Sequence, residues 1–90
     1  MPTIHLIVKG RVQGVSYRAS AKEEADRLSI TGWVRNTPEG YVEITATGND
    51  AALKAFTTWC RRGPAHAHVT GLITDPLPET PFPGFSIRRG

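Results

Sequence analysis

Residues 3–28 read TIHLIVKGRVQGVSYRASAKEEADRL, and the spacing of their apolar residues changes once along this stretch. Over residues 3–9, Ile4, Leu6 and Val8 alternate with other side chains, which predicts a strand with one buried face. Gly10 and Gly14 then bracket a predicted loop. After the loop the apolar residues fall on one face of a helix, and they are Tyr17, Ala21, Ala25 and Leu28.

Two serines compete as the start of this helix. Ser16 is a suitable N-cap residue, whereas Ser20 with Glu23 forms a capping box that would start the helix later. We favour Ser16, because the apolar face already includes Tyr17.

The rest of the chain predicts one more helix and four more strands. The turn composition of residues 37–40, TPEG, joins two short strands into a hairpin over residues 33–47. The predicted elements are a strand at 33–35, a strand at 41–46, a helix from Asn49 to Gly63-Pro64, a strand at 69–73 and a strand at 85–88. Residues 76–83 contain four of the seven prolines and predict a stiff connection before the last strand.

This order of elements predicts an α+β protein with the ferredoxin-like βαββαβ arrangement. We expect a mostly antiparallel sheet, two helices on one of its faces and a short C-terminal strand, all in a single domain over residues 1–90. The third strand of this arrangement lies antiparallel between the first and the second. The loop after the first strand and Asn36 after the second strand should therefore meet at one edge of the sheet.

Composition excludes several classes of protein. Apolar residues make up 39% and charged residues 21% of the 90, a balance that is typical of a folded chain. No apolar run approaches the roughly 18 residues of a membrane helix, and the first residues lack the pattern of a signal peptide. The single cysteine, Cys60, cannot form an internal disulfide. We expect a soluble, cytoplasmic, monomeric protein.

Positive charge gathers at the start of the chain. The net charge is +3, but residues 1–22 carry four basic residues and no acid, and the remainder of the chain carries a net charge of −1. Such a focused basic segment suits a small anion better than a nucleic acid, which calls for a broad basic surface.

The loop of residues 10–18 is the predicted anion site. It leads into a helix N-terminus, where backbone N–H groups are unpaired and the helix dipole is positive. Arg18 in the first turn is unfavourable there by about 0.3–1 kcal/mol, which makes it a functional candidate. The alternative is an ordinary loop with a solvated arginine. The P-loop nucleotide motif is absent, so a small phosphate compound is favoured.

Asn36 has two interpretations. The first confines it to the turn that follows, since asparagine is common in turns; in the second, its amide polarises a water beside the phosphate. The remaining candidates are weaker. His66 and His68 lack a third metal ligand, and His5 is expected to be exposed. Cys60, Trp33 and Trp59 are expected in the core.

No catalytic nucleophile with an activating base is evident, and no paired carboxylates stand at a loop end. An enzyme with this sequence would work by positioning and electrostatics on a substrate that is already reactive.

Two motifs resemble the acylphosphatase family, namely residues 8–18, VKGRVQGVSYR, and residues 32–36, GWVRN. Gly40, Gly48 and Gly63-Pro64 extend the resemblance nearly end to end, and Tyr17 stands where the family more often has Phe. The resemblance implies hydrolysis of a carboxyl phosphate to a carboxylate and inorganic phosphate, without metal, cofactor or phosphoenzyme. It also implies that phosphate is a product and a competitive inhibitor.

The resemblance also implies roles for particular residues. Arg18 would bind the phosphoryl oxygens and Asn36 would orient the attacking water. The backbone amides that would share the phosphate belong to Gln13, Gly14, Val15, Ser16, Tyr17 and Arg18.

Three other functions fit the predicted fold less well. An acylphosphatase-like accessory domain of a hydrogenase-maturation carbamoyltransferase would be followed by zinc-finger and transferase regions. An RNA-binding domain of this fold would carry aromatic residues on its central strands, whereas residues 41–45, YVEIT, include an acid. A metallochaperone of this fold would need paired cysteines. The stand-alone enzyme is therefore favoured.

Overall fold

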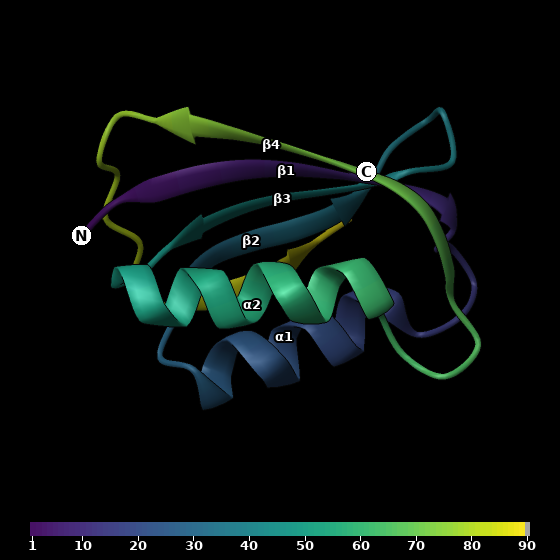
Figure 1. Cartoon of the computed structure of the whole chain (residues 1–90), viewed down its shortest axis with the longest axis horizontal. Helices are drawn as coiled ribbons and strands as arrows, with labels where there is room; N and C mark the ends of the chain where they lie inside the picture. Colours follow the sequence, from purple (N-terminus) through teal and green to yellow (C-terminus); the bar gives the residue numbers. More distant parts are fainter. Residues whose placement is uncertain (90) are drawn as a thin grey trace.

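The computed structural model describes residues 1–89 and contains seven regular elements (Figure 1). In chain order they are β1 (Thr3–Arg11), α1 (Tyr17–Arg27), β2 (Thr31–Asn36), β3 (Val42–Thr47), α2 (Asp50–Arg62), β4 (His68–Leu77) and β5 (Phe85–Arg88). No helix among the described residues is long and apolar enough to span a membrane.

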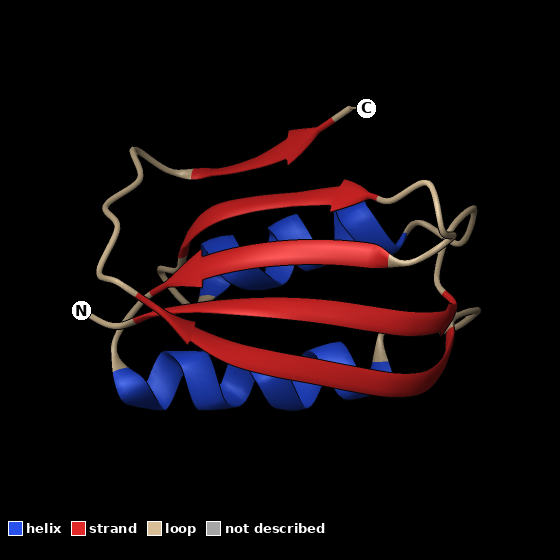
Figure 2. Cartoon of the chain, turned by 90° about the horizontal axis from the view of Figure 1, so that it is seen from above, coloured by secondary structure: helices blue, strands red, loops and turns tan. Residues whose placement is uncertain are grey.

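The five strands form one sheet in the order β4-β1-β3-β2-β5. All neighbouring strands are antiparallel except β2 and β5, which are parallel. Both helices cover the same face of this sheet (Figure 2). The ferredoxin-like α+β fold expected from the sequence is confirmed, including the short C-terminal strand.

β3 aligns the ends of β1 and β2. Val42, the first residue of β3, is paired with Val8 on one side and with Asn36 on the other. These three residues lie in one row across the sheet, with the two outer strands about 10 Å apart. Since β1 and β2 both run antiparallel to β3, they leave the sheet at the same edge, as the sequence predicts.

β1 is longer than predicted. It continues through Gly10 to Arg11, and its pairing with β4 shifts between Lys9 and Gly10, as in a β-bulge. Gly10 has a φ of 123°, and a Cβ atom there would lie 2.1 Å from the backbone oxygen of His68. The glycine thus permits a close approach of two strands rather than opening the loop.

β4 is also longer than predicted, since it extends to Leu77 and includes Pro76 from the proline-rich segment. Proline is tolerated here because β4 is an edge strand, where one side of the backbone needs no partner.

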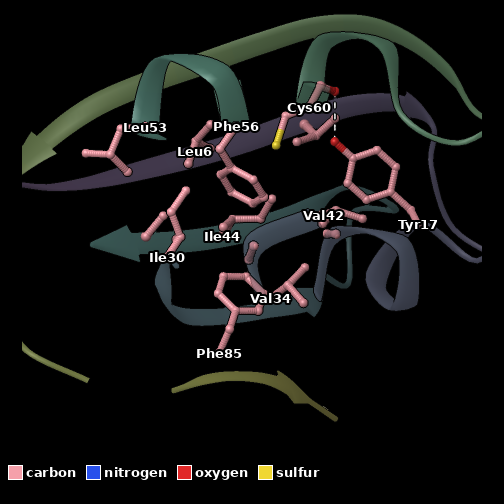
Figure 3. Close-up of a cluster of buried hydrophobic side chains, with 14 of the residues drawn as sticks. Leu6, Tyr17, Ile30, Val34, Val42, Ile44, Leu53, Phe56, Cys60 and Phe85 are labelled. Carbon is pink, nitrogen blue, oxygen red and sulfur yellow. Dashed lines mark hydrogen bonds between the residues drawn. The ribbon is translucent and has the colours of Figure 1, made fainter. Parts of the chain in front are cut away.

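The core lies between the sheet and the two helices (Figure 3). Phe56 of α2 is fully buried and meets Phe85 edge to face, with the ring centroids 6.0 Å apart. Burying one such side chain contributes about 1.5–3 kcal/mol. Tyr17 is also buried, and its hydroxyl donates a hydrogen bond of 2.8 Å to the backbone oxygen of Cys60. This contact joins the start of α1 to the end of α2.

The core predictions hold for some residues and fail for others. Cys60 is buried, and Trp59 is half-buried with its ring 5.4 Å from that of Tyr17. Trp33 is not in the core. It alternates with the buried residue Val34 and so lies on the sheet face opposite the helices, where the Arg88 guanidinium stacks 4.5 Å from its ring.

The sequence predicts an exposed His5, but His5 is half-buried on the same outer face of the sheet. Its Nε2 lies 2.6 Å from a carboxylate oxygen of Glu43, which also binds Arg35. The hydrogen bonds to His5 and Arg35 help to hold the pKa of the Glu43 carboxyl below its usual value, against the opposing effect of burial. The cluster lies on the face that the helices do not cover.

The buried Tyr17–Cys60 contact predicts a loss of stability in alkali. Burial raises the pKa of the Cys60 thiol from 9.0 to about 12 and also raises the pKa of the Tyr17 phenol. The unfolded chain releases these protons near pH 9–10, so their contribution is complete below about pH 8.5 and is lost as the pH rises toward 12. The free energy of unfolding in urea should be lower at about pH 11 than at about pH 8. Cys60→Ala should reduce this difference, because one of the two groups is removed. Equal stability at both pH values would contradict the prediction.

Candidate active site

The connection from β1 to α1 is shaped by two residues with positive φ. Gly14 has a φ of 72° and Ser16 a φ of 63°, so the chain takes left-handed conformations just before the helix. Ser16 is the N-cap position, and α1 begins at Tyr17 as predicted. The expected capping hydrogen bond is absent, however, because a left-handed Ser16 does not direct its hydroxyl to the first-turn amides.

The backbone of this connection leaves donors available. None of the amides of residues 13–18 donates to another residue within the described range. The first intrahelical bond runs from the Ser20 amide to the Ser16 oxygen, at 3.0 Å. No acidic side chain occupies the first turn of α1. A helix start with free N–H groups and no acid is suited to an anion.

A pocket of about 200 Å³ opens beside these amides. It is lined by Val12, Gly14, Ser16, Tyr17, Arg18, Ala19, Asn36, Ile87 and Arg89. The structure thus brings Arg18 and Asn36 together with Gly14, Ser16 and Tyr17 of the predicted loop. Both charged side chains that line the pocket are arginines, Arg18 and Arg89. Neither forms an ion pair with a carboxylate of the described residues.

Gln13 and Val15 do not line this pocket with their side chains. Val15 packs against the core, and the Gln13 side chain binds two backbone oxygens of the turn between β2 and β3. Their predicted contribution, through backbone amides, does not depend on where these side chains lie.

Asn36 is the last residue of β2 and has the same side-chain direction as buried Val34, toward the helices. Its Oδ1 atom is buried and has no hydrogen-bond partner among residues 1–89. A buried acceptor without a partner is costly, and such atoms often mark functional sites.

The turn after Asn36 is held by Thr37 rather than by Asn36. The Thr37 amide donates to the Tyr41 oxygen, at 2.9 Å, and the Thr37 Oγ1 atom accepts from the Tyr41 amide, at 3.1 Å. The Gly40 amide donates to the Thr37 oxygen, at 3.1 Å. The side chain of Asn36 takes part in none of these bonds, which argues against the interpretation that limits it to the turn.

Three lining residues lie outside the site predicted from the sequence, namely Ala19 of α1, Ile87 of β5 and Arg89 just after β5. Ile87 and Arg89 reach the pocket because β5 pairs in parallel with β2, with Ile87 opposite Val34. The paired residues of β2 and β5 are 53 positions apart and leave no local signal in the sequence, and Arg89 beside Arg88 forms no distinctive motif.

Other polar groups of the described residues are less suited to metal binding or catalysis. No cluster of three or more metal-binding side chains occurs within residues 1–89. Cys60 is buried and its pKa is raised to about 12, so its thiol is not a nucleophile at neutral pH.

A larger hollow, of about 730 Å³, lies against α1, α2 and the 63–67 segment. Its cationic side chains, Arg27 and Arg62, are accompanied by Glu23 and Glu24. Arg27 is bound to Glu24, so an anion would meet competing carboxylates there. The smaller pocket at the start of α1 has the better chemistry for an anion, despite its size.

Known proteins resemble this chain over nearly its whole length. The family model described as Acylphosphatase matches residues 4–87. A protein from Methylococcus capsulatus named "Acylphosphatase" is 49% identical over 90 residues, covering 99% of this chain and 98% of its own. One of the same name from Pseudomonas aeruginosa is 44% identical over 86 residues, covering 96% and 94%.

The fold is shared as well. The crystal structure of an acylphosphatase from Bacillus subtilis superposes with a TM-score of 0.95 at 36% identity, and the match covers 98% of this chain and 99% of that one. The extent of the family match, the identities of 49% and 44% to the two named relatives and the shared fold agree with one another. The chain therefore belongs to the acylphosphatase family.

Proposed function

We propose that this chain hydrolyses acyl phosphates to a carboxylate and inorganic phosphate, acting as a cytoplasmic, monomeric, single-domain enzyme. One observation carries the proposal: free loop amides, Arg18 and the side chain of Asn36 all meet at one pocket of about 200 Å³. The pocket is of a size for a phosphoryl group with a small acyl part.

The amides of residues 13–18 and the guanidinium of Arg18 bind the phosphoryl oxygens. Backbone N–H groups at a helix start present fixed dipoles that need little reorganisation as charge develops. The planar guanidinium adds two parallel donors and a full positive charge. Together they neutralise the phosphoryl group without a metal, which is why we propose no metal or other cofactor.

Asn36 orients the attacking water. Its side chain lines the pocket, and its amide can hydrogen-bond a water molecule and direct the water oxygen toward phosphorus. The new bond forms between water oxygen and phosphorus, the bond between phosphorus and the bridging oxygen breaks, and the protons of the water stay with the product phosphate. The leaving carboxylate is a weak base with a parent-acid pKa of about 4, so it departs without a general acid.

The proposed reaction can be tested with the purified chain and benzoyl phosphate or acetyl phosphate. We expect hydrolysis that is unchanged by EDTA. Inorganic phosphate should inhibit competitively, because it presents the same oxygens as the transferred group. Loss of activity in EDTA that magnesium or zinc restores would contradict the proposed metal-free mechanism. Noncompetitive inhibition would contradict phosphate binding at the substrate pocket.

Arg18→Lys tests the two-point contact of the guanidinium. Lysine keeps the charge but loses the planar fork, so we expect kcat/KM to fall by about 10- to 100-fold, the equivalent of one charge-assisted hydrogen bond. The inhibition constant of phosphate should rise in parallel. Arg27→Lys provides a matched control on the same helix, since Arg27 is exposed and lies at the far end of α1. Activity in Arg18→Lys equal to that of the control would remove Arg18 from the site.

Asn36→Ala tests the water-orienting role. We expect kcat to fall by about 10²–10³, as for the loss of one preorganised polar group. The phosphate inhibition constant should change little, because phosphate binds without the attacking water. The melting temperature should be preserved, since the Asn36 side chain makes no hydrogen bond to residues 1–89. A variant with normal kcat and a lowered melting temperature would show instead that Asn36 only shapes the turn.

A further inference from the structure

We propose that Gln13 is a positioning residue. Its side-chain amide fixes the phosphate-binding loop, residues 13–18, in place relative to Asn36. The inference rests on the proposed function and extends it to a side chain that does not line the pocket.

The Gln13 amide nitrogen donates both of its hydrogens to backbone oxygens of a single turn. Its Nε2 atom donates to the backbone oxygen of Thr37 and to that of Tyr41, each at 2.9 Å. Both acceptors belong to the connection between β2 and β3, and Thr37 directly follows Asn36 in the chain. One half-buried side chain therefore ties the loop to the backbone next to the proposed water-orienting residue.

The turn itself does not need these bonds to close. The Thr37 oxygen already accepts from the Gly40 amide, and the Tyr41 oxygen already accepts from the Thr37 amide. Each oxygen uses its second lone pair for Gln13. What Gln13 adds is the link between the turn and a loop 24 residues earlier.

Few other hydrogen bonds hold the loop in place. Its backbone amides make no hydrogen bond within residues 1–89, although buried Val12 and Tyr17 anchor its two ends. The loop carries the phosphoryl group and β2 carries Asn36, so these groups are held by different elements. A misplacement of about 1 Å between reacting groups can cost about 10²-fold in rate, so a fixed link between the two elements has a direct effect on kcat.

A positioning role and a merely structural role differ in a double-mutant cycle. If Gln13 acts by aligning Asn36, removing the two donors of Gln13 lowers kcat only while Asn36 is present. A structural role would lower stability and would lower activity by the same factor in either background.

The test uses Gln13→Met, which keeps the length of the side chain and removes both donors. We expect kcat for benzoyl phosphate to fall about 10-fold in the wild-type background and less than about 2-fold in the Asn36→Ala background. The phosphate inhibition constant should stay within about 3-fold of the wild-type value, because Arg18 and the loop amides remain together.

Thr47→Val is the matched control at the other end of β3. Its hydroxyl also makes two hydrogen bonds, at 2.7 Å to Thr3 Oγ1 and at 2.7 Å to the Thr80 oxygen. We expect Thr47→Val to lower the melting temperature about as much as Gln13→Met does, but to leave kcat unchanged. This comparison separates loss of stability from loss of alignment.

The possible results lead to different conclusions. Wild-type kcat in Gln13→Met, or an equal fold-loss in both backgrounds, would overturn the inference while leaving the proposed function intact. A wild-type chain without acyl phosphate hydrolysis would instead overturn the proposed function. If Gln13→Met does not fold, Gln13→Asn, which withdraws the amide by one methylene, enters the same cycle. Failure of both variants to fold would also overturn the inference, because Gln13 would then be required for the fold.

Discussion

The pairing of β3 with both β1 and β2 is the constraint on which the site depends. Val42 lies between Val8 and Asn36 in one row of the sheet, so the strand that leads to the loop and the strand that ends at Asn36 are held in fixed register. A slip of one residue would turn Asn36 away from the helices and would expose the core residues of β2. The same pairing that buries the core therefore also aligns the two parts of the site.

Most of the hydrogen-bond donors in the proposed site are backbone amides rather than side chains. The left-handed conformations of Gly14 and Ser16 present amides at the start of α1, and Arg18 supplies the charge. Buried Tyr17, which is bound to the Cys60 backbone oxygen, fixes the first turn of this helix against α2. Rigid support beneath a site made of backbone dipoles is what electrostatic preorganisation requires.

Local patterns predict the parts of this protein that local forces decide. Apolar spacing locates both helices, and Asn49 caps α2 as expected, with its Oδ1 atom accepting from the Ala52 amide at 2.7 Å. Alternation alone cannot tell which face of a sheet the helices cover, so Trp33 is wrongly predicted as core. Sequence patterns also do not reveal contacts between residues that are far apart in the chain. The Gln13 hydrogen bonds and the parallel β2–β5 pairing depend on tertiary packing. The left-handed conformation of Ser16 is also not predictable, because serine is common at N-cap positions with an extended backbone.

Anion binding to the amides at the start of α1 can be tested by titrating the ¹⁵N-labelled chain with inorganic phosphate and following the amide signals by NMR. We expect saturable shifts of the backbone amides of residues 13–18 and of the Arg18 side-chain Nε. The amides around Arg27 and Arg62, beside the larger hollow, should stay unchanged. Shifts confined to that hollow, or none at residues 13–18, would show that phosphate does not bind at the start of α1.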